Sequence, residues 1–371
     1  MIRCHVFTNI AEVLFLKQVP NFAYECDGVQ FSYGLEIPSN INILLVYTRA
    51  SYSIQTHLPK ERTIFVAGEP DVIHPFSMKF MNQFGLVLTS SSKALKTDKI
   101  QDNICSMPFV GLNFNDMDNP LNLSHFANMT AIEKDDRISV VTSSKAYTDF
   151  HKKRLLFLKQ LKEKIPDKLV MYGRGFRSID DKKDALLPHK YHLSLENGGG
   201  PFTWTEKLSD PLLCFALPFY HGCENYSDNL PADAAVPIEL EDVDAVINIM
   251  MEAQKEKLWE QRRPAMNQAR HLILTKFNLV KRFASLAKLA MAKDVTTSNL
   301  NTKRLIRSER SLWPEPGCRG SVAQCIIRSA IISIWPTAEL KAASLHQKIE
   351  ARRIRKRKIK IIQAEKVAQK N

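Results

Sequence analysis

Short, continuous runs of apolar residues alternate with polar, turn-rich segments through the first part of the chain. They stand at 41–47 (INILLVY), 63–67 (TIFVA) and 85–89 (GLVLT). Runs of this length, rich in Ile, Leu and Val, are typical of buried strands in a parallel sheet. The alternation predicts an open α/β sheet whose ligand-binding loops follow the carboxyl ends of the strands.

The middle of the chain repeats this pattern and predicts a second α/β unit. Strand-like runs are found at 138–141, 169–172, 191–195 and 217–220, and apolar residues at helical spacing at 147–162. Between the two regions, 112–136 is rich in Asn and Asp and has no clear period. We therefore expect an N-terminal domain (1–115), a linker (116–136), a second domain (137–260), helices (261–293) and a basic tail (294–371).

The most informative stretch runs from residue 189 to 222 and combines a strand, a glycine loop, a helix and a second strand. The first strand ends on Glu196 and Asn197, three glycines follow, and Thr205 precedes a helix that begins with Glu206 and Lys207. Glycines let the backbone approach a phosphate, and a helix N-terminus presents unpaired N–H groups to an anion.

The two charged residues at the start of that helix indicate the same kind of site. Lys207 stands where the helix dipole favours an acid, which indicates an anionic partner. Glu206 suits the two vicinal hydroxyls of a ribose. An ordinary Thr cap is the alternative, and the glycine triplet matches neither the G-x-G-x-x-G nor the Walker spacing. The stretch thus predicts a nucleotide site, with simple capping left open.

Two other strand ends carry candidate chemistry. The strand at 138–141 runs into Thr142, Ser143, Ser144 and Lys145, whose hydroxyls, amides and ammonium group suit phosphate oxygens. The strand at 63–67 ends on Gly68 and Glu69, so that a carboxylate can project into a cleft. A glutamate in a surface loop is the alternative for Glu69.

Three other patterns carry less weight. His74 is either an orienting group near Glu69 or a core histidine. Asp116-Met117-Asp118 matches the D-x-D pattern that holds a divalent ion and a diphosphate, but Asx-rich turns often produce it and we discount it. The basic cluster Lys152, Lys153 and Arg154 is of a kind usual on a solvated helix face.

Several blocks of the sequence resemble family 10 glycosyltransferases of the bacterial type, the α-1,3/1,4-fucosyltransferases. KYHLSLENGGGPFTWTEKLSDPLLCFALPFYHG is similar to the family signature of a strand, E-N, T-E-K, a helix and P-x-x-x-G. VVTSSKAYTDFHKKRLLFLKQL, YGRGF and RTIFVAGEP are similar to further family blocks. The resemblance covers 138 to about 255, with a weaker part at 42–93, and does not extend to 294–371.

The resemblance implies a GT-B fold, in which two Rossmann-like domains face a cleft, with a late helix that braces the first domain. It implies an inverting transfer of L-fucose from GDP-fucose to a glycan hydroxyl, with Glu69 as the general base. Arg154 and Lys207 would bind the leaving diphosphate. Other nucleotide-sugar-binding residues would be Ser143, Lys145, Glu196, Asn197, Thr203 and Glu206. No cofactor and no metal ion are implied.

Two departures from the family pattern limit this inference. Family members often have a tyrosine three residues before the T-E-K glutamate, where this chain has Thr203. The N-terminal membrane anchor of Golgi members is not expected here. A different nucleotide sugar therefore remains open as the donor, and the acceptor glycan is not predicted.

Charge is concentrated in the tail. The net charge is +13, and residues 294–371 hold 17 Lys and Arg and 6 Asp and Glu, a net +11 that leaves +2 for the rest. The run Arg352–Lys360 predicts contact with an anionic membrane, which suits a lipid-linked or lipopolysaccharide acceptor. Nucleic acid is disfavoured because the run has no interleaved aromatic residues. A disordered tail and a non-catalytic binding protein that acts through the tail are the alternatives.

The cysteines and the apolar runs bear on location. The seven cysteines are scattered and have no C-x-x-C spacing, so that neither a zinc site nor a disulfide framework is indicated. No apolar run reaches the roughly 20 residues that a membrane span needs. We expect a cytoplasmic protein, with peripheral contact at the inner face of the membrane.

Overall fold

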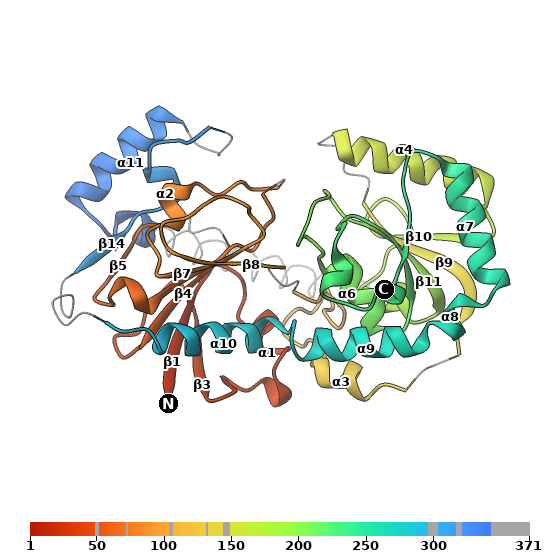
Figure 1. Cartoon of the computed structure of the whole chain (residues 1–371), viewed down its shortest axis with the longest axis horizontal. Coiled ribbons are helices and arrows are strands. Elements are labelled where there is room, and N and C mark those ends of the chain that lie inside the picture. The colour runs from red at the N-terminus through yellow and green to blue at the C-terminus, as the bar shows by residue number, and fades with distance from the viewer. Residues whose placement is uncertain are drawn as a thin grey trace, which may run out of the picture.

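The computed structural model forms two α/β domains that lie side by side (Figure 1). It describes residues 1–48, 52–71, 73–103, 107–130, 133–143, 149–295, 303–316 and 321–342. Each domain is built on its own largely parallel sheet, and the cavities described below open between and beside the two sheets. The predicted fold class, two Rossmann-like domains facing a cleft, is confirmed.

The N-terminal domain contains a seven-stranded sheet in the order β2-β3-β1-β4-β6-β7-β8. All its neighbours pair in parallel except β2 and β3. The strands are β1 (Ile2–Phe7), β2 (Glu25–Cys26), β3 (Val29–Gly34), β4 (Ile43–Tyr47), β6 (Thr63–Val66), β7 (Leu86–Thr89) and β8 (Asp98–Gln101), with short helices α1 (Val13–Leu16) and α2 (Met78–Met81). Every residue of β4, β6 and β7 is buried, which explains why these three strands were predicted as continuous apolar runs.

Strand β1 was not predicted, although it lies at the centre of the sheet. Polar Arg3 and His5 interrupt its apolar pattern. His5 is fully buried, and its ring nitrogens lie 2.9 Å from Ser32 Oγ and 3.1 Å from the Gly34 carbonyl, both of strand β3. A buried polar side chain is tolerated when it is hydrogen-bonded, and only the neighbouring strand shows that it is.

The second domain contains a five-stranded parallel sheet in the order β10-β9-β11-β12-β13. The strands are β9 (Asp135–Val141), β10 (Leu169–Tyr172), β11 (His189–Leu195), β12 (Leu217–His221) and β13 (Val236–Pro237). The helices are α3 (Leu123–Asn128), α4 (Asp149–Lys164), α5 (Lys183–Leu186), α6 (Glu206–Leu213), α7 (Val243–Lys255) and α8 (Leu258–Gln261). The strand order reverses at β9, since β10 lies on one side of it and β11 on the other. Open α/β sheets bind ligands at such topological switch points.

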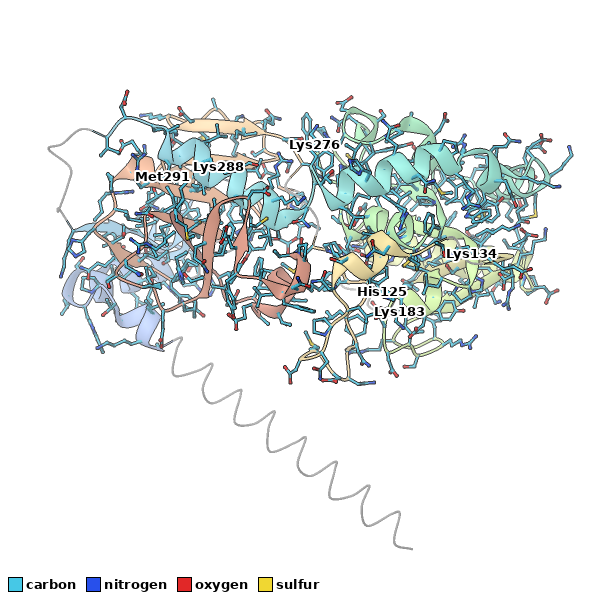
Figure 2. All side chains as sticks on the ribbon, turned by 90° about the horizontal axis from the view of Figure 1, so that it is seen from below. His125, Lys134, Lys183, Lys276, Lys288 and Met291 are labelled. Carbon is cyan, nitrogen blue, oxygen red and sulfur yellow. The ribbon has the colours of Figure 1, made fainter. Side chains whose placement is uncertain are left out.

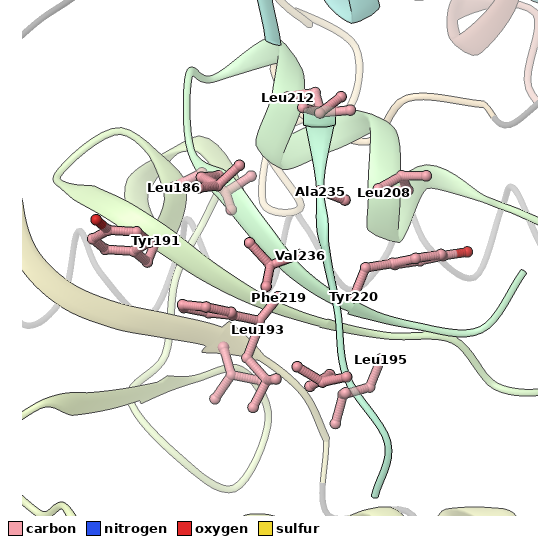
Figure 3. Packing of buried hydrophobic residues seen from close by; sticks show 14 of the residues in the cluster. Leu186, Tyr191, Leu193, Leu195, Leu208, Leu212, Phe219, Tyr220, Ala235 and Val236 are labelled. Atoms are coloured by element: carbon pink, nitrogen blue, oxygen red, sulfur yellow. The ribbon is translucent and has the colours of Figure 1, made fainter. Parts of the chain in front are cut away.

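The core of this domain forms where α6 packs on the sheet. Figure 3 shows Leu208 and Leu212 of α6 above Leu193 and Phe219 of the central strands. All four side chains are at most 1% exposed. Burial of each contributes about 2 kcal/mol, which holds the N-terminus of α6 in place beside the strand ends.

Helices α9 (Arg263–Leu274) and α10 (Leu279–Met291) span both domains along one side of the molecule (Figure 1). Helix α9 belongs to the core of the second domain, and α10 belongs to the core of the first. Asn278 caps α10 and donates through Nδ2 to the Gln18 carbonyl. Figure 2 views this side, with Lys276 at the junction of the helices and Lys288 and Met291 farther along α10. Helices α9 and α10 therefore connect the cores of the two domains.

The segment 294–371, expected as a basic tail, is partly folded against the N-terminal domain. Strand β14 (Arg304–Ile306) pairs antiparallel with β5 (Ile54–Thr56), followed by a 3-10 turn (Glu309–Ser311) and α11 (Val322–Ile334). We call residues 303–316 and 321–342 the C-terminal strap. The strap packs on the domain rather than following the alternative of a disordered tail, since Ile306, Cys325 and Ile332 are buried. The Arg352–Lys360 run lies outside the described residues.

Candidate active site

Two cavities meet at the carboxyl ends of the strands. The interdomain cavity, about 380 Å³, is lined by residues from both sheets. The C-domain cavity, about 630 Å³, is lined mostly by the second domain. Both are lined by the same three side chains, Asn197, Glu206 and Lys207. These residues therefore form the boundary at which ligands in the two cavities would meet.

The carboxyl ends of strands from both sheets border the interdomain cavity. Tyr47 and Glu69 come from the ends of β4 and β6, and Asn197 comes from the end of β11. Ligands of open α/β sheets bind at such crevices. Glu69, predicted from its place after a buried strand, thus lies in the same cavity as the loop and helix predicted to bind a nucleotide.

Gly68 allows the loop after β6 to pack closely against the loop after β4. A Cβ atom on Gly68 would lie 2.0 Å from Thr48 Cγ2, far inside van der Waals contact. Thr48 itself has a φ of +65°, so the loop after β4 has little freedom to give way. Glycine is required here because the loops after β4 and β6 are packed together, and this packing places Glu69 at the cavity.

The N-terminus of α6 is organised by a buried carboxylate. Glu196 is 2% exposed and accepts hydrogen bonds from the Thr205 amide (2.8 Å) and the Thr205 hydroxyl (2.6 Å). Thr205 in turn accepts from the Lys207 amide at 3.3 Å, the cap that was predicted. Burial raises the pKa of Glu196, and Lys207 opposes that shift. Glu196 therefore holds the loop between β11 and α6 in its shape.

Lys207 already has protein carboxylates as partners. Its ammonium group lies 3.1 Å from Glu206 Oε1 and 3.7 Å from Glu196 Oε2. Burial alone would raise the pKa of Glu206, but Lys207 and Lys182 outweigh it and lower the pKa to about 2. The unusual position of Lys207 is thus explained within the protein. The ligand anion that was inferred from this position is not needed to account for it.

Arg154 is buried with unused hydrogen-bonding capacity. It is 6% exposed, and its Nη1 donates to Asn197 Oδ1 at 2.8 Å. Its Nε has no partner among the described residues, and neither has the Oγ1 of Thr142, which also lines the C-domain cavity. Burial lowers the pKa of Arg154. Buried donors left unpaired are costly, and an anion in the cavity would supply acceptors.

The remaining predicted residues fall in several places. Ser143 lines the C-domain cavity, while Lys145 lies outside the described residues. Thr203 lines the interdomain cavity and donates through Oγ1 to the Gly200 carbonyl. Lys153 is half exposed and pairs with Glu241, as expected of a solvated face. Arg154, of the same basic cluster, is turned inward instead.

Two residues of the site were missed by the sequence analysis. Lys182 lines the C-domain cavity, and its ammonium group lies 3.1 Å from Asp210 Oδ2 and 3.6 Å from Glu206 Oε1. Asp210, in α6, is 1% exposed and accepts from the Phe109 amide at 3.0 Å. Lys182 stands in none of the quoted family blocks, and Asp210 stands in one of them but was given no role. Their roles depend on contacts between segments 28 and 101 residues apart.

Several expectations about metals, thiols and membranes concern the whole chain. In the part that the structure describes, no group of three or more His, Cys, Asp or Glu side chains could hold a metal ion. Asp116 accepts from Asn119 Nδ2, a contact within its own turn. Five of the cysteines, all buried, are free thiols (Cys4, Cys26, Cys214, Cys223 and Cys325). None of the described helices is long and apolar enough to cross a membrane.

Comparisons with known proteins give low similarities. No family model matches the sequence, and no curated protein matches it. Among solved structures, an α1,3-fucosyltransferase in complex with GDP-fucose is 15% identical over 80% of this chain and 91% of that chain, with a TM-score of 0.48. A UDP-glucose complex of Anabaena Alr3699/HepE is 9% identical over 79% and 100%, with a TM-score of 0.45. At these identities and scores, the activities of these proteins are not transferred to this chain.

Proposed function

We propose that the protein is an inverting glycosyltransferase that moves L-fucose from GDP-fucose to a hydroxyl group of a glycan. The observation that carries the proposal is that Glu69 and the pair Glu206 and Lys207 line one cavity from opposite domains. A base on one side and an anion-binding group on the other are what displacement at a sugar carbon requires. The family blocks in the sequence support the choice of fucose and GDP.

The diphosphate of the donor would lie in the C-domain cavity. Arg154 and Lys207 offer positive charge there, and Ser143 offers a hydroxyl group. Negative charge develops on the departing diphosphate, and one preorganised donor is worth about 3 to 4 kcal/mol in such a step. The ribose hydroxyls would hydrogen-bond to the ionised carboxylate of Glu206. The proposal assigns no step to a metal ion or an organic cofactor.

The sugar would project from the C-domain cavity into the interdomain cavity, towards Glu69. The acceptor oxygen attacks the anomeric carbon from the side opposite the diphosphate, and its proton passes to the Glu69 carboxylate. The bond between the anomeric carbon and the phosphate oxygen breaks, and its electron pair leaves with GDP. A single displacement of this kind inverts the configuration, and general-base catalysis contributes about 10²- to 10⁴-fold.

Thermal unfolding in the presence of a panel of nucleotides and nucleotide sugars tests the proposal. GDP and GDP-fucose should raise the melting temperature, since a ligand that binds only the folded state stabilises it. Glu206→Ala and Lys207→Ala should each abolish the shift, while Lys153→Ala, on the solvated face of α4, should preserve it. A shift with a different nucleotide sugar alone would contradict fucose as the substrate. No shift with any donor would contradict the enzyme.

We also propose that the protein adsorbs to an anionic membrane surface. The side chains of Ile326, Ile327 and Ile334 are 58%, 60% and 88% exposed on α11, ahead of the basic run Arg352–Lys360. Exposed apolar side chains and a basic run in the same chain segment suit such an interface. A lipid-linked or lipopolysaccharide acceptor would then be met at the membrane.

Sedimentation with lipid vesicles tests this second proposal. The protein should sediment with vesicles that contain phosphatidylglycerol and should stay in solution with pure phosphatidylcholine. A deletion should begin after residue 342, because the strap before it belongs to the N-terminal domain. If that deletion leaves sedimentation unchanged, the basic run is not the membrane contact. Loss of all binding without any effect of nucleotides would favour a non-catalytic protein.

A further inference from the structure

The loop that carries Glu69 is folded back on itself directly after that residue. It connects β6 to α2 and includes Pro70 and Pro75. The His74 amide donates to the Pro70 carbonyl at 2.8 Å, as does the Ile73 amide at 2.9 Å. These bonds close a turn beside Glu69. The turn therefore joins the backbone of His74 to Pro70, the residue directly after Glu69.

A carboxylate from the distant C-terminal strap holds this loop. Glu309 Oε2 lies 2.7 Å from Nε2 of His74, and Glu309 Oε1 accepts from the Ser77 amide at 2.9 Å. The His74 side chain is 7% exposed and that of Glu309 is 12% exposed. His74 also contacts the edge of Phe76. Both oxygens of the Glu309 carboxylate therefore bind residues of the loop.

The strap is also fixed to the N-terminal domain independently of that contact, through a separate two-stranded sheet. Strand β14 pairs with β5, the Ser308 amide donates to Ser53 Oγ at 2.9 Å, and the Ser53 amide donates to Glu339 Oε2 at 2.8 Å. Arg328 donates to the other oxygen of Glu339 at 2.6 Å. Because Ser308 precedes Glu309 directly, these bonds hold the backbone of Glu309. The Glu309 carboxylate therefore contacts the loop from a backbone that is held in place by other hydrogen bonds.

A second glutamate of the strap offers a matched comparison. Glu315 accepts from the amides of Met78 and Lys79, at 2.8 and 2.9 Å, at the start of α2. It therefore accepts hydrogen bonds from the start of α2, one and two residues beyond Ser77. Any effect of the strap on general stability should be shared by Glu309 and Glu315, whereas control of the Glu69 loop belongs to Glu309.

We propose that Glu309 is a positioning residue that holds the loop of Glu69 through His74 and Ser77. Its catalytic consequence rests on the proposed function. Loss of the carboxylate leaves a buried histidine and a backbone N–H group without their partner, so the loop moves to recover hydrogen bonds. A displacement of the base by about 1 Å can cost roughly 100-fold in rate.

The test compares Glu309→Ala, Glu309→Gln and Glu315→Ala in the full chain. GDP release from GDP-fucose should fall about 100-fold in kcat for Glu309→Ala, and less for Glu309→Gln, which can still accept from the Ser77 amide. The Kd of GDP should stay unchanged, because the proposed donor site lies on the other domain. Glu315→Ala should retain the wild-type kcat. Equal losses in Glu309→Ala and Glu315→Ala would overturn the proposal.

Hydrogen exchange separates this inference from the proposed function. Backbone amides of 69–77 should exchange about tenfold faster in Glu309→Ala, and at the wild-type rate in Glu315→Ala. If these amides exchange at the wild-type rate in Glu309→Ala, Glu309 does not hold the loop, whatever the activity of the variant. Wild-type protein that neither binds GDP nor releases it contradicts the proposed function, while the exchange rates still decide whether Glu309 holds the loop.

Discussion

The two domains present different surfaces to the cavity between them. From the N-terminal domain, the lining includes the apolar side chains of Ile10, Ile73 and Met107, and its carboxylate is Glu69. From the second domain, the boundary with the C-domain cavity consists of Asn197, Glu206 and Lys207, and buried Arg154 lines the C-domain cavity. Both surfaces lie at the carboxyl ends of parallel strands. The same architecture therefore carries two different kinds of chemistry.

This difference has a physical basis in charge. Lys182, Lys207 and Arg154 lie together on the second domain, where Glu196, Glu206 and Asp210 pair with the two lysines. A group of positive charges in a partly buried cavity suits a diphosphate. Glu69, in contrast, lies across the cavity among less charged neighbours. We infer that the domains divide the reaction into binding of the leaving group and removal of the acceptor proton.

The largest expected effect comes from breaking this division on the side of the base. Glu69→Gln keeps the size of the side chain and removes its basicity, so kcat for fucose transfer should fall about 10³-fold, within the range of general-base catalysis. The Kd of GDP, measured by calorimetry, should stay the same. Glu36→Gln, on the surface, serves as the control. A comparable loss of GDP affinity in Glu69→Gln would contradict the division.

The complementary change removes a cation from the second domain. Lys207→Met keeps most of the side-chain stem and should lower kcat about 10²- to 10³-fold, since one group that stabilises the transition-state charge is lost. The Kd of GDP should rise as well, in contrast to Glu69→Gln. Lys153→Met, in which the lost ammonium group pairs with Glu241 on the surface, should change neither value. If Lys207→Met left the affinity for GDP intact, the diphosphate would have to lie elsewhere.

A smaller effect is expected where the two halves of the chain are joined. Asp210→Ala leaves Lys182 and the Phe109 amide without their buried partner, and should lower the free energy of unfolding by about 3 kcal/mol. Asp210→Asn, which can still accept from the Phe109 amide, should lose less. Urea denaturation measures both values. Equal losses in the two variants would indicate that the charge on Asp210 is responsible.

The smallest effect concerns a feature that the two sheets share. Burial lowers the pKa of His5 in β1 to about 4 and that of His192 in β11 to about 3. Since an unfolded histidine has a pKa near 6.5, the unfolded state binds more protons below that pH. Stability is therefore present above pH 6.5 and is lost as the pH falls towards the folded pKa. As the pH falls from 6.5 to 5, each histidine should lower the free energy of unfolding by about 2 kcal/mol.

Denaturation at several pH values tests this effect in each domain. His5→Asn and His192→Asn should each reduce the dependence of stability on pH. His271→Asn, on the exposed side of α9, should leave the dependence as it is. A pH dependence that none of the buried-site variants changes would mean that other groups control acid unfolding.

The parts of the site that were predicted are those with local causes. Thr205 was predicted as a cap from its place before a helix, and it caps α6. Glu69 was predicted from its place after a continuous apolar strand together with the family resemblance, and it lines the interdomain cavity. Lys182 was not predicted, because the carboxylates that give it a role lie 24 and 28 residues farther along the chain. The fold of the strap was not predicted, because the net positive charge of 294–371 indicated a basic tail and only a few apolar residues of the strap are buried.

The sequence by itself determined the alternation of strands and helices, the presence of two α/β regions and the position of the glycine loop. These follow from short-range periodicity and from the backbone preferences of single residues. Tertiary structure alone decided that Arg154 turns inward, that Glu196 and Glu206 neutralise Lys207, and that Glu309 reaches the loop of Glu69. Such pairings depend on which segments fold against each other, since charge and hydrogen bonding act between neighbours in space.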